Sequence, residues 1–363
     1  MIFLVVPVWG AAIAILMQAA QQPHEDYFDA QVFLGAARAV VNGESPYGQY
    51  FVSPLWTAIL LSPLALLPLT WAAAALFWAN LGGWLLTILL TLRMLRQPWG
   101  WQLFTLAAAL MVFPPVVWST HGQVVVYPAL GVVLFMALVR RYPGLAGTSL
   151  ALLMIKPHLG AWLVLLLAIW SLRRGQWKVP LGFSLVFGGL AALSFLVQPG
   201  WAADWLAVLR QPPAALQPQW EQFGPTGFYF LRLIVGEQAA RVLAISLAIG
   251  LGGAMLCWLW RSRPIPDVAR VLTLAIPILF FITPYAQGYD LSLLYLPLAV
   301  FGAMRLQRRV VLRPWQIAAT GAVYLFPWVM PFMGWPQPVF VILPVLCLAL
   351  WPSYDWPQPP EER

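Results

Sequence analysis

A short acidic segment follows the first apolar stretch of the sequence. The run "HEDYFD" at residues 24–29 holds Glu25, Asp26 and Asp29, three of the twelve acidic residues in the 363-residue chain. A carboxylate within hydrogen-bond reach of a hydroxyl can act as a general base. A charged side chain beside hydrocarbon also costs on the order of a few kcal/mol. This concentration of carboxylates therefore marks a candidate reaction site.

Four other polar breaks between apolar stretches place ionisable or amide groups near expected helix ends. They are "WSTHGQ" (118–123), "IKPHLG" (155–160), "PTGFYFLRL" (225–233) and "TPYAQGYD" (283–290). Their candidate site residues are His121, Gln123, Lys156, His158, Arg232, Tyr289 and Asp290. Convergence of such groups from separate helices predicts a polar cavity. The alternative is that they only cap helix ends and turns.

A metal cluster is not recognisable among these residues. The three histidines, His24, His121 and His158, fall in separate loops without a ligand spacing. Asp26 and Asp29 would bind a divalent ion only weakly. We therefore expect no metal and no other cofactor.

The composition defines the class of protein that must position these groups. Hydrophobic residues make up 61% of the chain and charged residues 9%, whereas about a quarter of the residues in soluble proteins are charged. Cys257 and Cys347 fall inside apolar stretches and have no partner spacing, so we expect them to be packing residues. The net charge of +8 comes from short clusters between apolar stretches, which indicates membrane topology rather than a nucleic-acid partner. The sequence predicts an all-α, polytopic membrane protein.

Twelve apolar stretches are candidate transmembrane helices. They are 2–20, 70–92, 102–118, 123–139, 144–155, 159–172, 178–197, 240–260, 268–284, 289–304, 315–332 and 338–351. The first is interpreted as a span rather than a cleaved signal sequence because it lacks a positively charged start. No internal repeat is apparent, so residues 1–351 form a single transmembrane domain, followed by a cytoplasmic tail at 352–363.

Positive charges orient these spans. Fifteen of the twenty Lys and Arg residues fall on one side, which is expected to be cytoplasmic. Eight of the twelve acidic residues and all three histidines then lie on the outer side. Charge parity requires that residues 51–69 do not cross, although a thirteenth span there is the alternative. Because prolines interrupt that stretch, residues 31–43 and 55–67 are predicted to be interfacial helices within the first outer loop, 21–69. A second outer loop spans 198–239.

The order of motifs resembles a known family. The stretch from Asp29 to Tyr47, the "PLWTAILLSPLALLP" stretch, "GQ" at the start of a span, "KPH" at the end of one and the late "TPYAQGYDLSLLYLP" resemble glycosyltransferase family 87, over residues 1 to about 305. That family belongs to the GT-C superfamily and includes polyprenyl-phosphate-mannose-dependent mannosyltransferases. The resemblance implies an inverting sugar transfer at the outer face, with a carboxylate of the first outer loop as base. Two interfacial helices in that loop are also what the superfamily implies.

The resemblance also suggests individual roles. Asp29 matches the family's acidic position and is expected to be the general base, with Asp26 and Glu25 as alternates; an N-cap is the structural alternative for Asp29. Lys156 matches a Lys-Pro position and Arg232 an arginine of the family, and both are expected at the donor phosphate, with His158 beside Lys156.

Five residues are expected to contact the sugar or the acceptor, and Glu25 is one of them. His121 and Gln123 contact sugar hydroxyls or phosphate, or else cap the following helix. Tyr289 and Asp290 occupy a place where some relatives have a histidine pair. Asp290 either binds acceptor hydroxyls or pairs with an outer-face cation such as Arg232.

These considerations predict a multi-pass enzyme of a prokaryotic plasma membrane. Its expected partners are a polyprenyl-phosphate-linked sugar, which the resemblance implies is mannose, a glycolipid or glycan acceptor and membrane lipids, without nucleic acid. The rival class is a transporter or flippase of a lipid-linked or anionic solute. That class usually has internal repeats and charges near the bilayer midplane, and no such charge pair is evident in the sequence.

Overall fold

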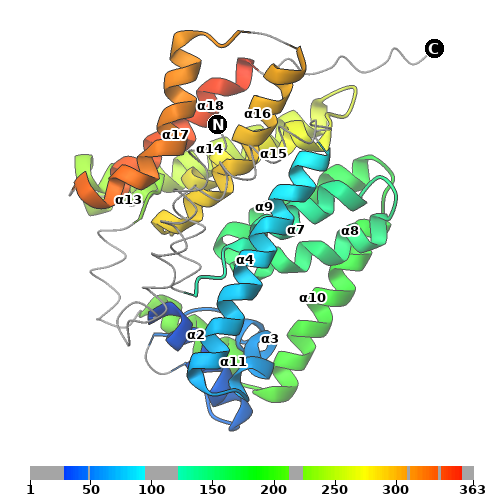
Figure 1. The fold of residues 1–363 in the computed structure, drawn as a ribbon, viewed down its shortest axis with the longest axis vertical. Coiled ribbons are helices and arrows are strands. Elements are labelled where there is room, and N and C mark those ends of the chain that lie inside the picture. Colours follow the sequence, from blue (N-terminus) through cyan, green and yellow to red (C-terminus); the bar gives the residue numbers. More distant parts are fainter. Residues whose placement is uncertain are drawn as a thin grey trace, which may run out of the picture.

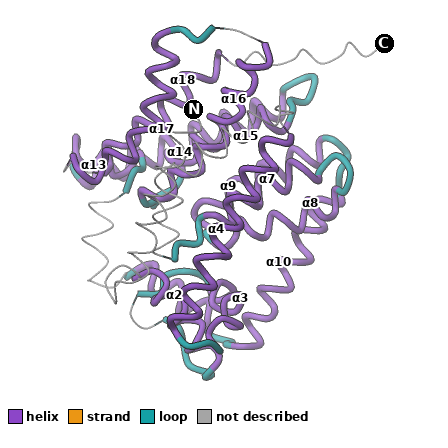
Figure 2. The backbone as a smooth tube through the Cα atoms, viewed as in Figure 1, coloured by secondary structure: helices purple, strands orange, loops and turns teal. Residues whose placement is uncertain are grey.

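The computed structural model describes residues 28–47, 50–94, 122–211, 224–308, 311–333 and 337–353. Within these ranges the chain forms helices joined by loops, without a strand (Figures 1 and 2). The prediction of an all-α protein is confirmed for the described residues. The expected spans at 2–20 and 102–118 lie outside them.

Three described helices are long and apolar enough to cross a membrane: α4 (Leu69–Met94), α10 (Lys178–Val197) and α14 (Glu237–Arg261). They correspond to the stretches predicted at 70–92, 178–197 and 240–260. Their sequences are apolar over most of their surface, which is typical of helices in contact with lipid. This supports the membrane class, while the total of twelve spans stays a prediction.

The remaining predicted spans within the described residues are also helical, and several are interrupted. They are α7 (Val126–Leu138), α8 (Pro143–Ser149), η1 (Leu150–Ile155), α9 (Pro157–Arg173), α15 (Val268–Ile282), η2 (Gly288–Leu294), α16 (Tyr295–Arg308), α17 (Pro314–Met333), η3 (Gln337–Val341), α18 (Ile342–Leu350) and η4 (Trp351–Ser353). The η elements are 3₁₀ turns, which sequence periodicity does not distinguish from α-helix. Two of them, η1 and η2, adjoin the polar breaks at 155–160 and 283–290.

The two helices predicted for the first loop are present as α2 (Phe28–Val41) and α3 (Leu55–Ala65). α3 has 11 residues, so it is about 16 Å long, too short to cross a hydrocarbon core of about 30 Å by itself. Pro63 lies inside the helix, as the predicted helix over 55–67 requires. The Ser62 hydroxyl donates to the carbonyl of Ile59 at 2.7 Å, which satisfies the acceptor that a proline at 63 leaves free.

Helices α2 and α3 pack at the end of the molecule where α4 begins and α10 ends (Figure 1). Helix α11 (Trp201–Arg210) lies beside them. Its Trp201 and Trp205 rings pack edge-on against Trp56 of α3. The Trp205 ring nitrogen donates to the carbonyl of Val52 at 2.9 Å. The 198–239 loop therefore packs in part on the helices of the first loop.

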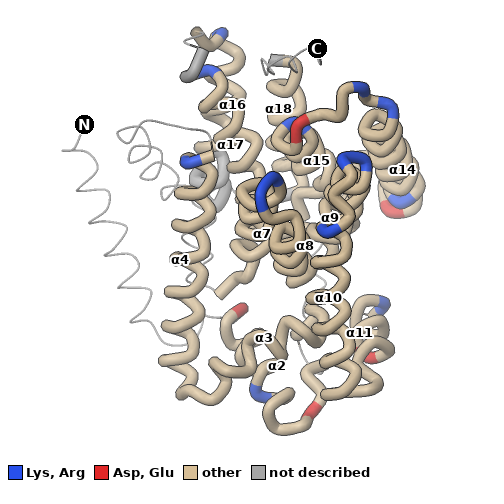
Figure 3. Tube along the Cα trace, turned by 90° about the vertical axis from the view of Figure 1, so that its right-hand side faces the viewer, with Lys and Arg blue, Asp and Glu red and all other residues tan. Residues whose placement is uncertain are grey.

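The opposite end of the bundle carries most of the described cations, in the upper half of Figure 3. Loops at 139–142, 173–177 and 262–267 meet there. Arg140 pairs with Asp267 at 2.7 Å, and Arg174 donates to the carbonyl of Ile265 at 3.1 Å. Three clusters assigned to one side from the sequence thus share one end of the fold.

Candidate functional site

Lys156 stands at a break between η1 and α9. Its backbone is non-helical, with φ −123° and ψ 80°, and Pro157 begins α9. A proline disfavours helical geometry in the residue before it, so the Lys-Pro pair itself produces this break. Side chains of α3 contact the carbonyls just before it: Trp56 donates to Met154 at 2.8 Å and Thr57 to Ile155 at 3.4 Å.

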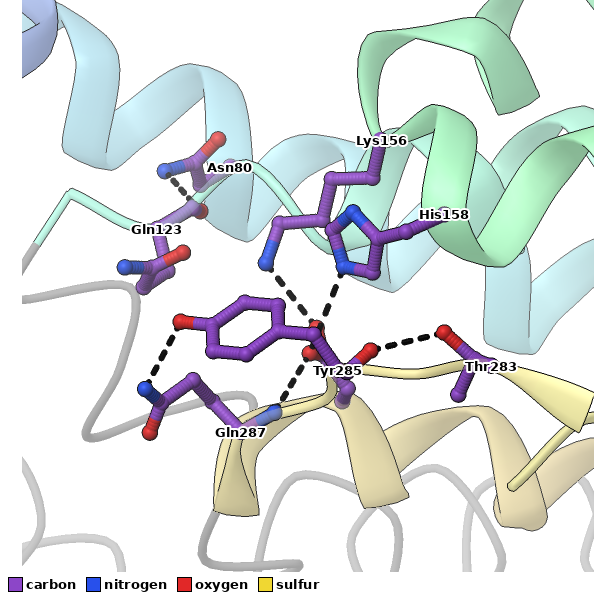
Figure 4. Close-up of polar contacts among 8 residues, drawn as sticks. Asn80, Gln123, Lys156, His158, Thr283, Tyr285 and Gln287 are labelled. Atoms are coloured by element: carbon purple, nitrogen blue, oxygen red, sulfur yellow. Dashed lines mark hydrogen bonds and ion pairs between the residues drawn. The ribbon is translucent and has the colours of Figure 1, made fainter. Parts of the chain in front are cut away.

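The Lys156 side chain forms a buried ion pair. Its Nζ donates to Oδ1 of Asp290 at 2.9 Å, and the two side chains are 7% and 0% exposed (Figure 4). The same Nζ lies 4.1 Å from the centroid of the Tyr289 ring, a cation–π distance. His158 Nε2 lies 4.0 Å from Asp290 Oδ2, which is too long for a hydrogen bond. Charges of both signs are thus present at the 155–160 and 283–290 breaks.

The segment that carries Asp290 is fixed by its own hydrogen bonds. Asp290 Oδ2 accepts from the backbone N–H of Gln287 at 2.8 Å. The Gln287 amide donates to the Tyr285 hydroxyl at 2.7 Å, and the Thr283 hydroxyl donates to the Tyr285 carbonyl at 2.7 Å (Figure 4). These hydrogen bonds hold together the loop between α15 and η2, which forms one side of the candidate site beside Lys156.

The Gly122–Gln123 turn forms a second side of the candidate site. Gly122 has φ +82°, and a Cβ on it would lie 2.5 Å from the Cβ of Ala30 and 2.7 Å from its Cα. Only glycine permits this conformation and this approach. The turn is therefore seated on the first turn of α2, next to Asp29. Asn80 of α4 donates to the Gln123 carbonyl at 2.9 Å.

Asp29 lies in the first turn of α2. It is inside the helix as described, not before it, so its carboxylate favours the positive helix end from within the turn. It also interacts electrostatically with Tyr289. The Lys156 ammonium lies over the Tyr289 ring, so a carboxylate of the first loop and a buried lysine are both within electrostatic range of Tyr289.

Burial controls the ionisation of the polar groups outside the predicted spans. It lowers the pKa of His158, an effect that the nearby Asp290 carboxylate partly opposes. It raises the pKa of Tyr285, so this hydroxyl stays protonated at neutral pH. His158 Nε2 is buried without a hydrogen-bond partner within the described residues. A neutral imidazole and a protonated phenol are groups that bind oxygen ligands without adding charge.

The structure brings together most of the described residues that the sequence singled out. One group forms around Asp290, which pairs with Lys156 and lies near His158 and Tyr289. Gln123 belongs to the turn at Gly122, and Asp29 is within electrostatic range of Tyr289. His121, Asp26 and Glu25 lie outside the described residues. In the described part of the chain, no group of three or more His, Cys, Asp or Glu side chains could hold a metal ion.

Arg232 takes a different partner from the one considered in the sequence. It pairs with Glu237 at 2.8 Å, where α13 (Gly227–Val235) meets α14. The cation that Asp290 pairs with is therefore Lys156 and not Arg232. The N-terminal part of α13 does approach the site, since Tyr229 interacts electrostatically with Tyr285.

Three site residues were missed in the sequence: Asn80, Tyr285 and Gln287. Asn80 could have been noticed as a polar residue within the apolar stretch 70–92, because such residues are rare in membrane spans. Tyr285 and Gln287 stand in the quoted "TPYAQGYD" motif, but nothing local indicates that they bond to each other.

The sequence model of glycosyltransferase family 87 matches residues 51–284, more than half of the chain. The chain belongs to glycosyltransferase family 87. Gln123, Lys156, His158 and Arg232 lie within the matched range of this family 87 protein, whereas Asp29, Tyr289 and Asp290 lie outside it. No match was found among curated proteins or among solved structures. Family membership and the long apolar helices together make the chain a membrane glycosyltransferase.

Proposed function

We propose that this family 87 glycosyltransferase moves a sugar, mannose by resemblance to the family, from a polyprenyl-phosphate donor to a hydroxyl of a glycolipid or glycan. The reaction takes place at the outer face of a prokaryotic plasma membrane. One observation carries the proposal: Lys156 lies over the Tyr289 ring, and Asp29, far away in the sequence, is within electrostatic range of the same tyrosine. Transfer from a lipid phosphate requires a base and a phosphate-binding cation in one place.

Asp29 acts as the general base in this reaction. The acceptor oxygen attacks the anomeric carbon, its proton passes to the Asp29 carboxylate, and the bond between that carbon and the phosphate oxygen breaks. The electron pair leaves with the polyprenyl phosphate, and the anomeric configuration inverts. A base positioned in this way contributes roughly 10²–10⁴-fold to the rate.

Lys156 binds the phosphate of the donor. An ammonium group has three N–H donors, and one of them is used by Asp290. The others remain for a phosphate oxygen, whose negative charge grows as the bond breaks. His158 lies beside the same carboxylate and is a further phosphate ligand. Arg232 contacts Glu237 through its Nε, so a phosphate contact from this residue would use its other guanidinium N–H groups.

The side on which the site lies follows from the charge distribution. The loops at 139–142, 173–177 and 262–267, which contact one another, lie in the upper half of Figure 3, away from α2 and α3. If that end is cytoplasmic, as the positive-inside rule indicates, the site opens outward. Labelling of an engineered cysteine in the exposed turn at Glu44 by a membrane-impermeant thiol reagent would test this orientation.

The assignment of Asp29 is tested with purified protein in lipid, polyprenyl-phosphate-mannose and a panel of glycolipid acceptors. We expect Asp29→Asn to lower transfer by at least about 100-fold. The matched control is Glu44→Gln, which removes an exposed carboxylate from the α2–α3 connection and should leave transfer unchanged. Full transfer by Asp29→Asn would remove this residue from the base role.

A transporter is the second candidate, and one observation favours it. The buried Lys156–Asp290 pair is the kind of charge pair that the sequence did not reveal and that transporters carry inside the membrane. Vesicles loaded with acceptor distinguish the two. Uptake or flipping of labelled donor without a new glycosidic bond would favour the transporter.

A further inference from the structure

Asn80 is a polar side chain in the middle of an apolar helix. It lies within α4, one of the three helices long enough to span a membrane, and its side chain is fully buried. Polar residues in such helices are costly and usually functional. Since Asn80 is more than ten residues from either end of α4, it does not serve as a cap.

The Asn80 amide holds the Gly122–Gln123 turn from the side of α4. Its Nδ2 donates to the Gln123 carbonyl at 2.9 Å. A carbonyl oxygen only accepts hydrogen bonds, so this contact fixes which way the Asn80 amide points. On its other side the turn is seated against Ala30 of α2. The position of Gln123 is thus set from two helices at once.

Gln123 presents an unsatisfied group next to the candidate site. Its side chain is 5% exposed, and its Oε1 is buried without a hydrogen-bond partner among the described residues. In Figure 4 the Gln123 side chain extends from the turn toward the region of Tyr285 and Lys156 Nζ. A buried amide oxygen without a partner is costly in free energy. Binding of a ligand that donates a hydrogen bond would remove this cost.

The chemistry of that ligand is restricted. An amide oxygen accepts from an O–H or N–H group, and a phosphodiester has neither. A sugar hydroxyl has the required donor and can also accept from the amide nitrogen of Gln123. The phosphate is therefore left to Lys156, and the ligand of Gln123 is a carbohydrate hydroxyl, which the deoxy donors below assign to the donor or exclude from it.

We propose that Gln123 binds one hydroxyl of the transferred sugar and that Asn80 is the positioning residue that aims it. The inference rests on the proposed function and extends it. It assigns the selection of the donor sugar to Asn80 of α4 and Gln123 of the Gly122–Gln123 turn. Asn80 acts through the Gln123 carbonyl, and its own Oδ1 is likewise buried without a hydrogen-bond partner among the described residues.

Four variants test this pair: Asn80→Thr, Gln123→Leu, the double variant of both, and Thr91→Val as the control. Asn80→Thr is expected to fold, because a threonine hydroxyl on α4 bonds to its own helix, as Thr87 does with Gly83 at 2.8 Å. It removes the donor to the Gln123 carbonyl. Thr91 is equally buried on α4 but bonds only within the helix, to Thr87.

Transfer is measured with the full donor and with donors that lack one ring hydroxyl at a time. We expect wild type to lose roughly tenfold or more in kcat/KM with one of these deoxy donors. Asn80→Thr and Gln123→Leu should each lose roughly tenfold with the full donor and little further with that deoxy donor. The double variant should match Gln123→Leu within about twofold, since the two residues act as one unit. Thr91→Val should behave as wild type.

The outcomes separate this inference from the proposed function. If Asn80→Thr discriminates among the deoxy donors as wild type does, or if the two substitutions multiply, the positioning role is wrong. If wild type transfers sugar from none of the polyprenyl-phosphate donors, the proposed function fails and this inference fails with it.

Discussion

The two ends of the helical bundle use charge in opposite ways. At the cationic end, Arg140 and Asp267 form a pair whose side chains are 76% and 43% exposed, and Arg174 bonds to a loop carbonyl. At the site end, Lys156 and Asp290 form a pair that is almost completely buried. The Arg140–Asp267 pair leaves both charges in contact with solvent, whereas the Lys156–Asp290 pair buries both charges.

The free energies of the two arrangements differ in kind. An exposed ion pair contributes about 0–1 kcal/mol and loses part of that in salt. A buried pair costs more to desolvate than an apolar pair of the same volume, which would often be as stable or more so. The cationic end is therefore explained by topology and loop packing. The Lys156–Asp290 pair is not explained by stability and points to function.

Removal of one member of the buried pair should have the largest effect. Lys156→Met leaves the Asp290 carboxylate buried without its cation, so we expect a loss of about 3–5 kcal/mol in the free energy of unfolding and loss of transfer. The neutral double variant Lys156→Met/Asp290→Asn keeps an acceptor for the Gln287 N–H and should recover most of the stability but no transfer. Denaturant unfolding in detergent and the transfer assay measure the two effects. Recovery of transfer in the double variant would contradict a role for Lys156 at the phosphate.

A pair of glycine substitutions compares the two ends directly. Gly122→Ala combines strain at φ +82° with a Cβ only 2.5 Å from Ala30, and we expect a loss of about 2–4 kcal/mol with a reduced transfer rate. Gly175→Ala, beside the cationic end, has a similar φ of +70° but no atom near the added Cβ. It should cost about 1 kcal/mol and leave transfer intact. If the two glycine variants lost the same free energy of unfolding, the close contact between Gly122 and Ala30 would not contribute to stability.

The site end should also respond to pH. Burial lowers the pKa of His158 below that of the unfolded chain, which is about 6.5. As the pH falls below that value, the unfolded state takes up a proton that the folded state does not, so stability decreases toward acid and is unaffected above it. Thermal unfolding between pH 5 and 8 should show a shallower acid decrease in His158→Gln. If stability fell with decreasing pH as steeply in His158→Gln as in wild type, groups other than His158 would cause the loss of stability in acid.

The smallest effect is expected at the exposed pair. Arg140→Ala should change the free energy of unfolding by less than about 1 kcal/mol and leave transfer within about twofold. The small loss should shrink further in high salt, because exposed charges are screened. A loss as large as that of Lys156→Met would remove the distinction between the two ends.

Helix positions were largely predictable from the sequence. Residues 178–197 and 315–332 were expected as spans and form α10 and α17, and 55–67 corresponds to α3. Apolar stretches and proline or glycine breaks are local signals, so they predict local structure. The 3₁₀ turns η1 and η2 were not predicted, because hydrogen-bond pattern within a short helix leaves no trace in composition.

Partners within the site were less predictable. Lys156 and Asp290 were both selected, yet Arg232 was considered as the partner of Asp290, because nothing in the chain specifies a pairing across 134 residues. Asn80 does not belong to any of the sequence motifs used to select candidate site residues. Its contact with Gln123 follows from how α4 packs on α7, which is a property of the folded chain.

The bonds from Trp56 and Thr57 to the residues just before Lys156 have a mechanical consequence. They attach α3, whose Leu60 side chain is exposed, to the backbone that carries the Lys156 ammonium group. A displacement of α3 would therefore be passed through these two hydrogen bonds to the backbone at Lys156.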